Sequence, residues 1–244
     1  MQIEVFSTVT STNVIAREKA AIGMPEGYTV IADTQTHGKG RKDRSFFSPS
    51  GTGIYMSILF RPTQYSSQEA MKLTTMAAVA VCEAIEAVSG EQAQIKWVND
   101  IYVAGKKVCG ILTEASFGLE DGRLEYAIVG IGINVTPPTD QFPTKLKNIA
   151  GTIFTATQTD GKNRLAAEVL NRCMKHYAML KTADHIEAYR NRSLVIGRDI
   201  RVISFGGSRK ATALDIDDDC RLIVKYENGQ IEKLSFGEIS VKLS

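Results

Sequence analysis

A glycine-rich basic segment is the first stretch of the sequence whose residues are suited to chemistry. It spans residues 38–44 and reads G-K-G-R-K-D-R. Glycines let backbone N–H groups approach an anion closely, and the four basic side chains supply positive charge. The segment predicts a loop that folds over a phosphate, with a solvated basic loop as the competing interpretation. Asp43 stands where a dinucleotide fingerprint needs glycine, and no helix pattern follows, so a Rossmann site is excluded.

A second candidate group lies at residues 96–112, in the runs K-W-V-N-D-I and K-K-V-C-G-I-L. Asn99 and Asp100 interrupt two apolar pairs, which predicts a side-chain network at a turn. Lys107 precedes a strand in which Gly110 permits a close backbone approach. For an isolated lysine, a surface position on a hairpin is the usual interpretation.

A glycine pair and a helix start complete the candidates. Gly130 and Gly132 lie in the run V-G-I-G-I-N-V, and glycines weaken an apolar strand unless a ligand ring or another strand packs against the backbone. A bulge or tight strand–helix packing is the alternative. Residues 10–13 read T-S-T-N, a dense set of helix N-cap residues. A helix N-terminus also suits an anion or a polar headgroup, although capping alone explains any one of them.

The elements that must position these residues form a mixed pattern, which predicts the α+β class. Apolar spacing and turn residues predict strands ending at 6 and spanning 28–32, 54–60, 95–97, 101–103, 107–115 and 123–135. They predict helices from residues 10–13 to Gly23, then over 66–87, 163–180 and 184–190. Residues 33–53 are polar, glycine-rich and too long for a plain connection, so we expect a functional loop there.

The sequence changes character after Gly197. Five short strands are predicted near residues 200–202, 211–214, 222–224, 231–234 and 239–241. Short strands at this density are typical of a small β-barrel appended to a larger domain. We therefore expect a first domain of residues 1–194 and a second of residues 195–244.

Composition limits the class of protein. The 244 residues are 43% apolar and 23% charged, with a net charge of only +2, which is the usage of an ordinary globular domain and does not suggest a protein that coats nucleic acid. No run approaches the ~20 apolar residues of a membrane helix, and the N-terminus does not read as a signal peptide. Four scattered cysteines are not a disulfide framework, so we expect reduced thiols and a cytoplasmic protein.

The ordered combination of motifs carries more information than any one of them. T-S-T-N, Q-T-H-G-K-G-R-K-D-R-S-F, K-W-V-N-D-I-Y-V, G-K-K-V-C-G-I-L and G-I-G-I-N-V follow one another through residues 8–135. In this order and spacing they resemble the biotin protein ligase family, and the C-terminal strands resemble its small SH3-like domain. The basic loop and the K-W-x-N-D run are the specific parts of the match.

The resemblance implies a fold and an activity. It implies a catalytic domain built on a mixed β-sheet flanked by helices, which makes biotinyl-5′-adenylate from biotin and ATP with Mg²⁺ and then passes biotin to a lysine of a biotin carboxyl carrier domain. It implies no nucleic-acid or membrane partner, and either a monomer or a homodimer. Only about nine residues precede the first motif, too few for a helix-turn-helix, so we expect a monofunctional ligase that does not repress transcription.

The resemblance also assigns site residues. It places biotin against Ser11, Thr12, Asn13, Gln35, Gly38, Lys39, Gly40, Arg41, Lys107, Gly110, Gly130 and Gly132, with Trp97 and Ile111 in the apolar wall. It places ATP or the adenylate against Lys39, Arg41, Arg44, Phe46, Lys96, Asn99, Lys107 and Asn134. Lys107, Arg41 and Asp100 are the expected catalytic residues, with Phe46 stacking on adenine and Asp100 receiving or orienting the acceptor amine. No residue is assigned as a metal ligand.

The sequence departs from the family pattern at four positions, which are Thr10, Lys39, Asp43 and Val98. Lys39 keeps the charge of the usual arginine but loses its bidentate fork. Two other functions stay open at this point. A lipoate–protein ligase would use the same adenylation chemistry, although the K-W-V-N-D run and the β-rich C-terminus favour biotin. A non-catalytic binding protein would use the basic loop as a nucleic-acid patch, for which one nearby aromatic residue makes a poor groove.

Overall fold

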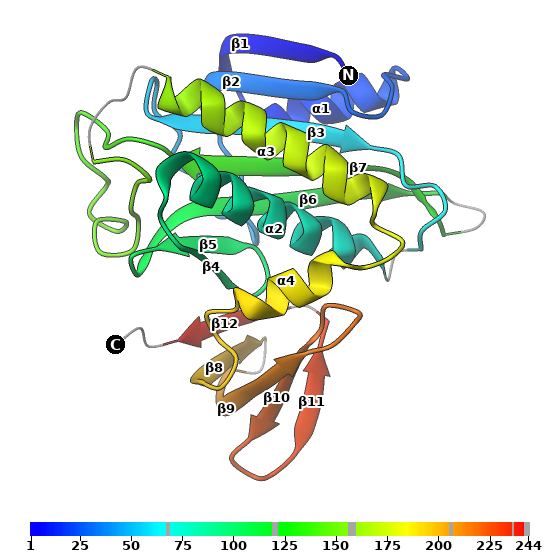
Figure 1. The fold of residues 1–244 in the computed structure, drawn as a ribbon, viewed down its shortest axis with the longest axis vertical. Coiled ribbons are helices and arrows are strands. Elements are labelled where there is room, and N and C mark those ends of the chain that lie inside the picture. Colours follow the sequence, from blue (N-terminus) through cyan, green and yellow to red (C-terminus); the bar gives the residue numbers. More distant parts are fainter. Residues whose placement is uncertain (67–68, 119–121, 156–159, 205–206, 236, 242–244) are drawn as a thin grey trace.

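Twelve strands and four helices make up the described part of the computed structural model, which comprises residues 1–66, 69–118, 122–155, 160–204, 207–235 and 237–241 (Figure 1). Seven strands form one mixed sheet in the order β1-β2-β3-β7-β6-β5-β4. Their bounds are β1 Ile3–Val9, β2 Thr29–Gln35, β3 Gly53–Phe60, β4 Ala93–Lys96, β5 Asp100–Val103, β6 Lys106–Phe117 and β7 Leu124–Asn134. Only β1 and β2 pair in parallel; the other neighbours are antiparallel.

Helices cover both faces of this sheet. Helix α1 (Thr12–Ala21) packs on one face against β2, β3 and β7, while α2 (Ala70–Ser89) and α3 (Gly161–Ala178) pack on the other (Figure 1). Every residue of the central strand β3 is buried, because the strand is covered on both faces. Ile58 belongs to the core under α2, and the next residue, Leu59, belongs to the core under α1. This alternation assigns each residue of the central strands to one face.

The C-terminal strands form a second sheet. It is antiparallel, in the order β11-β10-β9-β8-β12. Its strands are β8 Asp199–Ser204, β9 Gly207–Ile216, β10 Leu222–Tyr226, β11 Ile231–Leu234 and β12 Glu238–Val241. The short helix α4 (His185–Asn191) lies between the two sheets in Figure 1. The expected α+β class, with a mixed sheet, flanking helices and a separate C-terminal β unit, is confirmed.

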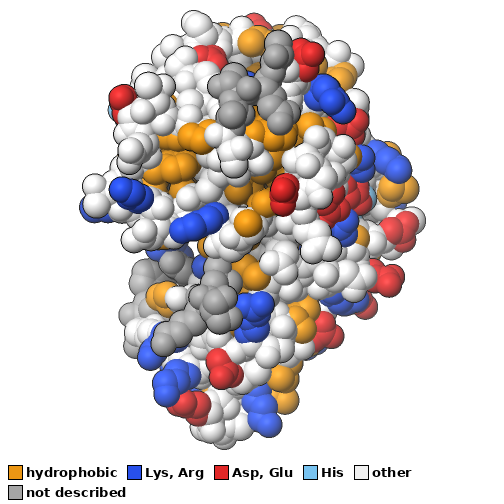
Figure 2. Space-filling model, turned by 60° about the vertical axis from the view of Figure 1, so that its left-hand side comes forward, with side chains coloured by type: hydrophobic (Ala, Val, Ile, Leu, Met, Phe, Trp, Pro, Cys, Tyr) orange, Lys and Arg blue, Asp and Glu red, His pale blue; other side chains and the backbone are white. Residues whose placement is uncertain are grey.

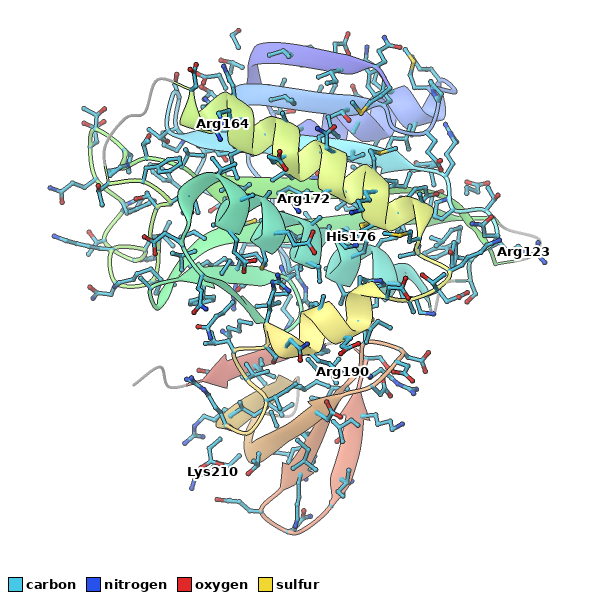
Figure 3. The ribbon with its side chains drawn as sticks, in the orientation of Figure 1. Arg123, Arg164, Arg172, His176, Arg190 and Lys210 are labelled. Atoms are coloured by element: carbon cyan, nitrogen blue, oxygen red, sulfur yellow. The ribbon has the colours of Figure 1, made fainter. Side chains whose placement is uncertain are left out.

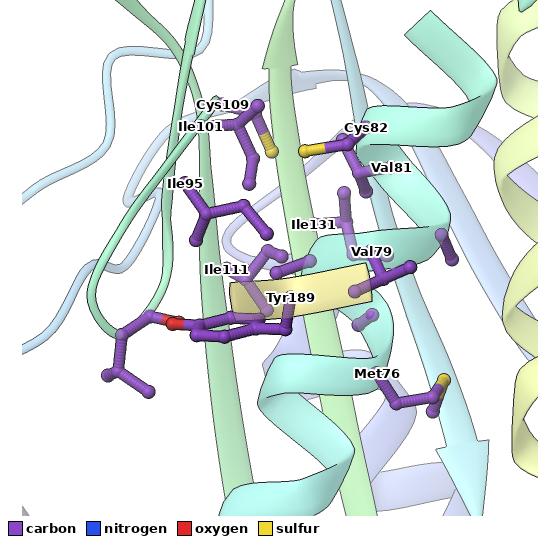
Figure 4. Packing of buried hydrophobic residues seen from close by; sticks show 14 of the residues in the cluster. Met76, Val79, Val81, Cys82, Ile95, Ile101, Cys109, Ile111, Ile131 and Tyr189 are labelled. Atoms are coloured by element: carbon purple, nitrogen blue, oxygen red, sulfur yellow. The ribbon is translucent and has the colours of Figure 1, made fainter. Parts of the chain in front are cut away.

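Helix α4 joins the two units through buried side chains. Tyr189 is 1% exposed, packs among core residues from α2 and the strands, and donates a hydrogen bond to the Val98 carbonyl at 2.9 Å (Figure 4). Arg190 lies at the junction in Figure 3, where its guanidinium binds Asp218 at 2.6 Å. From the turn between β4 and β5, Trp97 donates its indole N–H to the Cys220 carbonyl at 3.0 Å. The C-terminal sheet is therefore held on the rest of the chain by specific polar contacts around an apolar centre.

The observed elements extend most of the predicted ones. Strands β6 and β7 and helix α3 begin and end within two or three residues of the expected bounds. Helix α2 begins at Ala70, later than the predicted start at Ser66–Ser67. Ser66 instead donates both its N–H and its hydroxyl to the carboxylate of Glu69, and Glu69 is the N-cap residue of the helix. Ser67 lies outside the described residues. No helix in the described part of the chain is long and apolar enough to cross a membrane.

Basic and acidic side chains are interspersed on the face shown in Figure 2, in keeping with the small net charge. Helices α2 and α3 are joined by an ion pair: Arg172 of α3 binds Glu83 of α2 at 3.2 Å, and His176 reaches the same carboxylate at 3.0 Å (Figure 3). These pairs tie the two helices to each other on the face opposite α1.

A buried histidine at the junction predicts a pH-dependent stability. His185 is 2% exposed, and its Nε2 lies 3.2 Å from the Thr75 hydroxyl. Burial lowers the pKa of His185 to about 4, and the charges of His176 and Lys72 act in the same direction. Because the unfolded chain binds this proton at its ordinary pKa of 6.5, the free energy of unfolding is greatest above pH 6.5. It should fall by about 3 kcal/mol as the pH drops from 6.5 to 4.

Chemical denaturation at a series of pH values measures this dependence. His185→Gln should flatten the curve between pH 6.5 and 4, whereas His37→Gln, at an exposed site, should leave it unchanged. A His185→Gln curve as steep as that of the native chain would contradict the assignment.

Candidate functional site

A cavity of about 400 Å³ opens on the α1 face of the large sheet. Its walls come from the first turn of α1, the end of β2, the 36–52 loop, strands β5, β6 and β7, the 142–150 segment and the C-terminal sheet. Segments far apart in sequence meet there because the side chains of Tyr55 and Ser57 on β3, and the bare backbone of Gly130 and Gly132 on β7, belong to this face. The cavity is the meeting place of all four motif groups in the sequence.

Gly130 lets the start of α1 reach the sheet. It is paired across the sheet with Ser57 on β3 and with Leu112 on β6. A Cβ atom at Gly130 would lie 2.0 Å from Oδ1 of Asn13. The Asn13 side chain therefore occupies the space that any other residue would fill, and it donates from Nδ2 to the Leu112 carbonyl at 3.3 Å and to Glu114 at 2.7 Å.

Gly132 lets an aromatic ring lie directly against the sheet. It is paired with Tyr55 on one side and with Gly110 on the other. The Phe46 ring rests on this row: a Cβ atom at Gly132 would lie 2.6 Å from the ring, and one at Gly110 would lie 3.4 Å from it. Phe46 also meets Tyr55 edge to face, with ring centroids 6.4 Å apart. The glycine pair of the sequence is thus explained by two close contacts within the chain, one for each glycine.

One end of the cavity is a network of neutral polar groups. Gln35 Oε1 accepts from the Thr12 backbone N–H at 2.9 Å and from the Thr12 hydroxyl at 3.2 Å. Gln35 Nε2 donates to Ser48 Oγ at 2.9 Å, and Ser48 donates to the Phe46 carbonyl at 3.0 Å. Ser11 is the N-cap residue of α1, yet its side chain makes no capping hydrogen bond. This end suits an uncharged ligand that carries both donors and acceptors.

The other end carries an ion pair. Lys107 Nζ lies 2.5 Å from Asp100 Oδ1, and both side chains are less than a third exposed. Strand pairing fixes the two residues, since β5 and β6 form a hairpin. The Lys107 backbone is held further by Ile149 and Gly151, because its N–H donates to the Ile149 carbonyl at 2.8 Å and its carbonyl accepts from the Gly151 N–H at 2.8 Å. The ammonium is therefore held in place at one edge of the cavity beside Gly110.

Arg41 connects the basic loop to two other parts of the chain. Its guanidinium donates to Asn99 Oδ1 at 3.1 Å and to the Gly237 carbonyl of the C-terminal sheet at 3.0 Å. Asn99 is fixed in turn by its own bond to the Ile111 carbonyl at 2.7 Å. The tip of the loop turns at Lys42 and Asp43, which both have positive φ. This arrangement places a cationic loop over the cavity, between the large sheet and the C-terminal unit.

Burial sets the protonation of two groups in the cavity wall. It raises the pKa of Tyr102 to about 12, with a contribution from the Asp100 charge. It also raises the pKa of the Cys109 thiol well above its usual range. Cys109 is 1% exposed and is therefore a neutral packing residue rather than a nucleophile.

The structure brings the predicted site residues together. All of them line the cavity except Gly38, which lies just behind it; a Cβ atom there would lie 2.4 Å from the Phe46 carbonyl oxygen. Asn134, at the end of β7, donates to the Gly151 carbonyl at 3.2 Å. Trp97 and Ile111 also line it.

Other lining or supporting residues were not predicted from the sequence. Phe47 and Phe142 form an edge-to-face pair with centroids 6.3 Å apart at the cavity, and Gly237 and Ile239 enter it from the C-terminal sheet. Ser57 supports the polar end from behind. Its signal in the sequence is one serine within an otherwise apolar strand, whereas the 142–150 segment has no pattern that would have indicated it.

The cavity offers few ligands to a metal ion. In the described part of the chain there is no group of three or more histidine, cysteine, aspartate or glutamate side chains placed to hold one. Asp100 is the one carboxylate among the described residues of the lining, with the Asn99 and Asn134 amides close by in the wall. One carboxylate suits a Mg²⁺ ion that arrives on phosphates and keeps several waters.

Comparison with known proteins gives matches along most of the chain. Residues 5–134 match the model of the Biotin/lipoate A/B protein ligase family, and residues 195–242 match that of the Biotin protein ligase C terminal domain. The chain is 38% identical over 240 residues to the bifunctional ligase/repressor BirA of Bacillus spizizenii, covering 96% of this chain and 72% of the relative. It is 29% identical over 245 residues to the biotin--[acetyl-CoA-carboxylase] ligase of Mycobacterium tuberculosis, covering 98% and 88%.

A solved structure agrees over the whole chain. The biotin protein ligase from Aquifex aeolicus in complex with biotin and ATP superposes with a TM-score of 0.81 at 25% identity, covering 100% of this chain and 99% of that one. The arrangement of both sheets is thus similar to that of a ligand-bound structure.

The two glycines beneath Phe46 predict a graded response to an added methyl group. Gly132→Ala should lower the free energy of unfolding by about 1–3 kcal/mol, because its Cβ would lie 2.6 Å from the half-buried Phe46 ring. Gly110→Ala is the matched control, since its Cβ would meet the same ring at an ordinary 3.4 Å. Denaturant unfolding of both variants measures the difference, and equal losses of stability would contradict the contact.

Proposed function

The chain belongs to the biotin/lipoate A/B protein ligase family, and we propose that it performs its ligase reaction in the cavity on the α1 face. In that reaction biotin and ATP form biotinyl-5′-adenylate and pyrophosphate, and biotin then passes to a lysine of a biotin carboxyl carrier domain. The observation that carries the proposal is the placement of the Lys107 ammonium, held by Asp100 at 2.5 Å, at the opposite end of the cavity from the neutral Thr12–Gln35 network. These two ends match the two ends of biotin, which are an ionised tail and an uncharged ring.

Biotin binding would use the neutral end. The ureido ring carries two N–H donors and one carbonyl acceptor, and the hydroxyls of Ser11 and Thr12 and the amide of Gln35 supply partners of both kinds. Trp97 and Ile111 supply apolar wall. In this proposal Asn13 does not bind biotin directly, because the oxygen and the nitrogen of its amide are already hydrogen-bonded to Ser57, Leu112 and Glu114.

The first chemical step joins two anions. A biotin carboxylate oxygen attacks the α-phosphorus of ATP, a new P–O bond forms, and the bond to the departing pyrophosphate breaks. No general base is required, because the carboxylate is already ionised at neutral pH. The obstacle is repulsion, which the Lys107 ammonium offsets by binding the carboxylate and an α-phosphate oxygen together. Such a charge-assisted hydrogen bond contributes about 1.5–3 kcal/mol.

The basic loop and its surroundings would bind the nucleotide. Lys39, Arg41, Arg44 and Lys96 line the cavity and supply positive charge to the phosphates. Arg41 holds Asn99 now, and it can exchange this neutral partner for a phosphate oxygen, a stronger acceptor. A Mg²⁺ ion that accompanies ATP would supply further charge neutralisation, with Asp100, Asn99 and Asn134 as the available oxygen donors.

Aromatic residues supply a stacking surface for adenine. Phe46 was expected in this role, but its ring already rests on Gly132 and Gly110. Phe47, the next residue, is paired with Phe142 at the cavity wall. We therefore assign the adenine contact to the Phe47–Phe142 edge and the cover of the glycine floor to Phe46.

The second step transfers the biotinyl group. The amine of the acceptor lysine attacks the acyl carbon, the C–N bond forms, the C–O bond to AMP breaks, and the amine loses a proton. Asp100 is the one carboxylate among the described lining residues, so it is the proposed group that receives this proton or orients the amine.

The C-terminal unit would complete the site. We place its boundary between residues 194 and 195, and the match of the C-terminal family model from residue 195 supports this. Gly237 and Ile239 bring the unit into the cavity wall. Four free, buried cysteines support the proposal that the protein works in the reducing cytoplasm.

Loss of the Lys107 ammonium tests the first step. Lys107→Ala should lower biotin-dependent pyrophosphate release by about a hundredfold or more, because the charge that develops at the α-phosphate loses its partner. Labelling of a carrier domain, followed by mass spectrometry after incubation with biotin and MgATP, should fall in parallel.

Lys106→Ala is the matched control. Lys106 is the neighbouring residue, is exposed, and binds the Asn148 carbonyl rather than a cavity group. Native-like pyrophosphate release by Lys107→Ala would refute the proposed role, and so would an equal loss in both variants.

Asp100→Asn tests the second step in isolation. Supplied with preformed biotinyl-5′-adenylate, which bypasses the first step, this variant should label the carrier about tenfold to a hundredfold more slowly than the native chain, because the amine loses its proton acceptor. Quenched-flow labelling measures the rate.

Asp43→Asn is the control for the loss of one negative charge. Asp43 is exposed at the loop tip with φ of 57°, a conformation that asparagine tolerates. Transfer by Asp100→Asn at the native rate would show that Asp100 has no part in this step.

A further inference from the structure

A buried hydroxyl lies directly behind the polar end of the cavity. Ser57 is fully buried in β3 and is not part of the cavity lining. Its Oγ lies 2.8 Å from Thr12 Oγ1 and 2.6 Å from Asn13 Oδ1, so it contacts two adjacent residues of the first turn of α1. A hydroxyl in an apolar strand is costly unless it is hydrogen-bonded, and these two contacts are what satisfy it.

The partners of Asn13 fix the direction of the Ser57 proton. Asn13 Nδ2 donates to the Leu112 carbonyl and to the Glu114 carboxylate, which both accept, so the amide oxygen faces Ser57. A carbonyl oxygen can only accept. The single hydroxyl proton of Ser57 is therefore donated to Asn13 Oδ1.

The Ser57 proton in turn fixes the Thr12 hydroxyl. With its proton committed to Asn13, the Ser57 oxygen can only accept from Thr12. Thr12 has one other polar neighbour in the network, Gln35 Oε1 at 3.2 Å, which also only accepts. In either orientation the Thr12 hydroxyl donates its proton to a group inside the protein, which is Ser57 Oγ or Gln35 Oε1. A lone pair of the Thr12 oxygen is therefore left for the cavity.

We infer that Ser57 is a positioning residue that holds the Thr12 hydroxyl as a hydrogen-bond acceptor toward the ligand, and so makes the cavity selective for a ring that presents an N–H group. The inference rests on the proposed function, in which the ureido ring of biotin supplies that N–H. A dithiolane ring such as that of lipoate has no N–H to offer. Without Ser57, the Thr12 proton keeps, within this network, only its longer contact with Gln35 Oε1 at 3.2 Å, so it turns toward the cavity more readily and the preference for an N–H donor weakens.

Ser57→Ala tests this by a ratio of specificities. The ratio compares kcat/KM for biotin with kcat/KM for biotin methylated on its ureido nitrogens, measured by pyrophosphate release. The ratio should fall about tenfold in the variant, the amount that one hydrogen bond contributes to recognition. The KM for biotin should rise by a similar factor, while the KM for ATP and the kcat at saturation should stay within about twofold of the native values, because the charged end of the cavity is unchanged.

Two further variants separate positioning from general loss of structure. Thr75→Val removes another fully buried hydroxyl, one that binds the backbone of α2, His185 and Cys220 outside the cavity, and it should leave the ratio unchanged. Ser57→Cys keeps the shape of the side chain with a weaker donor and should lower the ratio about threefold, which tests the inference even if Ser57→Ala does not fold.

The outcomes are distinct. A lowered ratio in both Ser57 variants with an unchanged ratio in Thr75→Val supports the inference. An unchanged ratio in Ser57→Cys, or an equal fall in Thr75→Val, overturns it. A native chain that releases no pyrophosphate with biotin and MgATP contradicts the proposed function itself, and the inference falls with it.

Discussion

The absence of side chains at three positions on one face of the large sheet is the constraint on which the site depends. Gly130 and Gly132 on β7 and Gly110 on β6 leave bare backbone where neighbouring positions on the same face, such as Tyr55, Leu112 and Ile128, carry side chains. Asn13 rests on the first of these glycines and Phe46 on the other two. Because both contacts are closer than a Cβ atom would permit at Gly130 and Gly132, the helix start and the loop can only lie where they do if these residues are glycine. The cavity is what remains between them.

This constraint also sets the two chemical ends of the cavity. The first turn of α1, held by Asn13, brings Thr12 to Gln35 and makes a neutral, hydrogen-bonding end. Further along the sheet, the β5–β6 hairpin brings Lys107 to Asp100 and makes a charged end. A ligand with a polar ring and an ionised tail is accommodated in one orientation, because reversing it would bring the ring to the ion pair and leave the carboxylate among neutral groups. Orientation is a large part of what a ligase must supply, since it converts an encounter of two anions into an aligned attack.

Local sequence patterns predicted most of the helices and strands, and the motifs identified many of the residues that line the cavity. The reasons for both are physical. Apolar spacing identified β6, β7 and α3, because these elements bury one regular set of side chains. The glycine pair indicated a close approach to the backbone, but the partners, Phe46 and Asn13, were not evident because the contacts span 86 and 117 residues of chain, respectively. The 142–150 segment and the entry of Gly237 depend on tertiary packing alone. At the predicted start of α2, Ser66 and Glu69 instead close a turn, in which Ser66 donates to the Glu69 carboxylate and the Glu69 N–H donates to the Ser66 carbonyl.

Arg41 is held by neutral oxygen atoms that a phosphate could replace. Its present partners are a neutral amide oxygen on Asn99 and a backbone carbonyl at Gly237, both weaker acceptors than a phosphate. These contacts satisfy the guanidinium and tie the loop to the C-terminal unit, yet they can be exchanged for charged oxygens at little cost. A carboxylate in the place of Asn99 would hold the same guanidinium more tightly and oppose that exchange. Lys107 is the opposite case, since its ion pair with Asp100 fixes the position of the ammonium while leaving two of its three N–H donors for the reactants. In the proposed reaction, Arg41 would exchange its present partners for the nucleotide, whereas Lys107 would stay paired with Asp100 and align the reacting atoms.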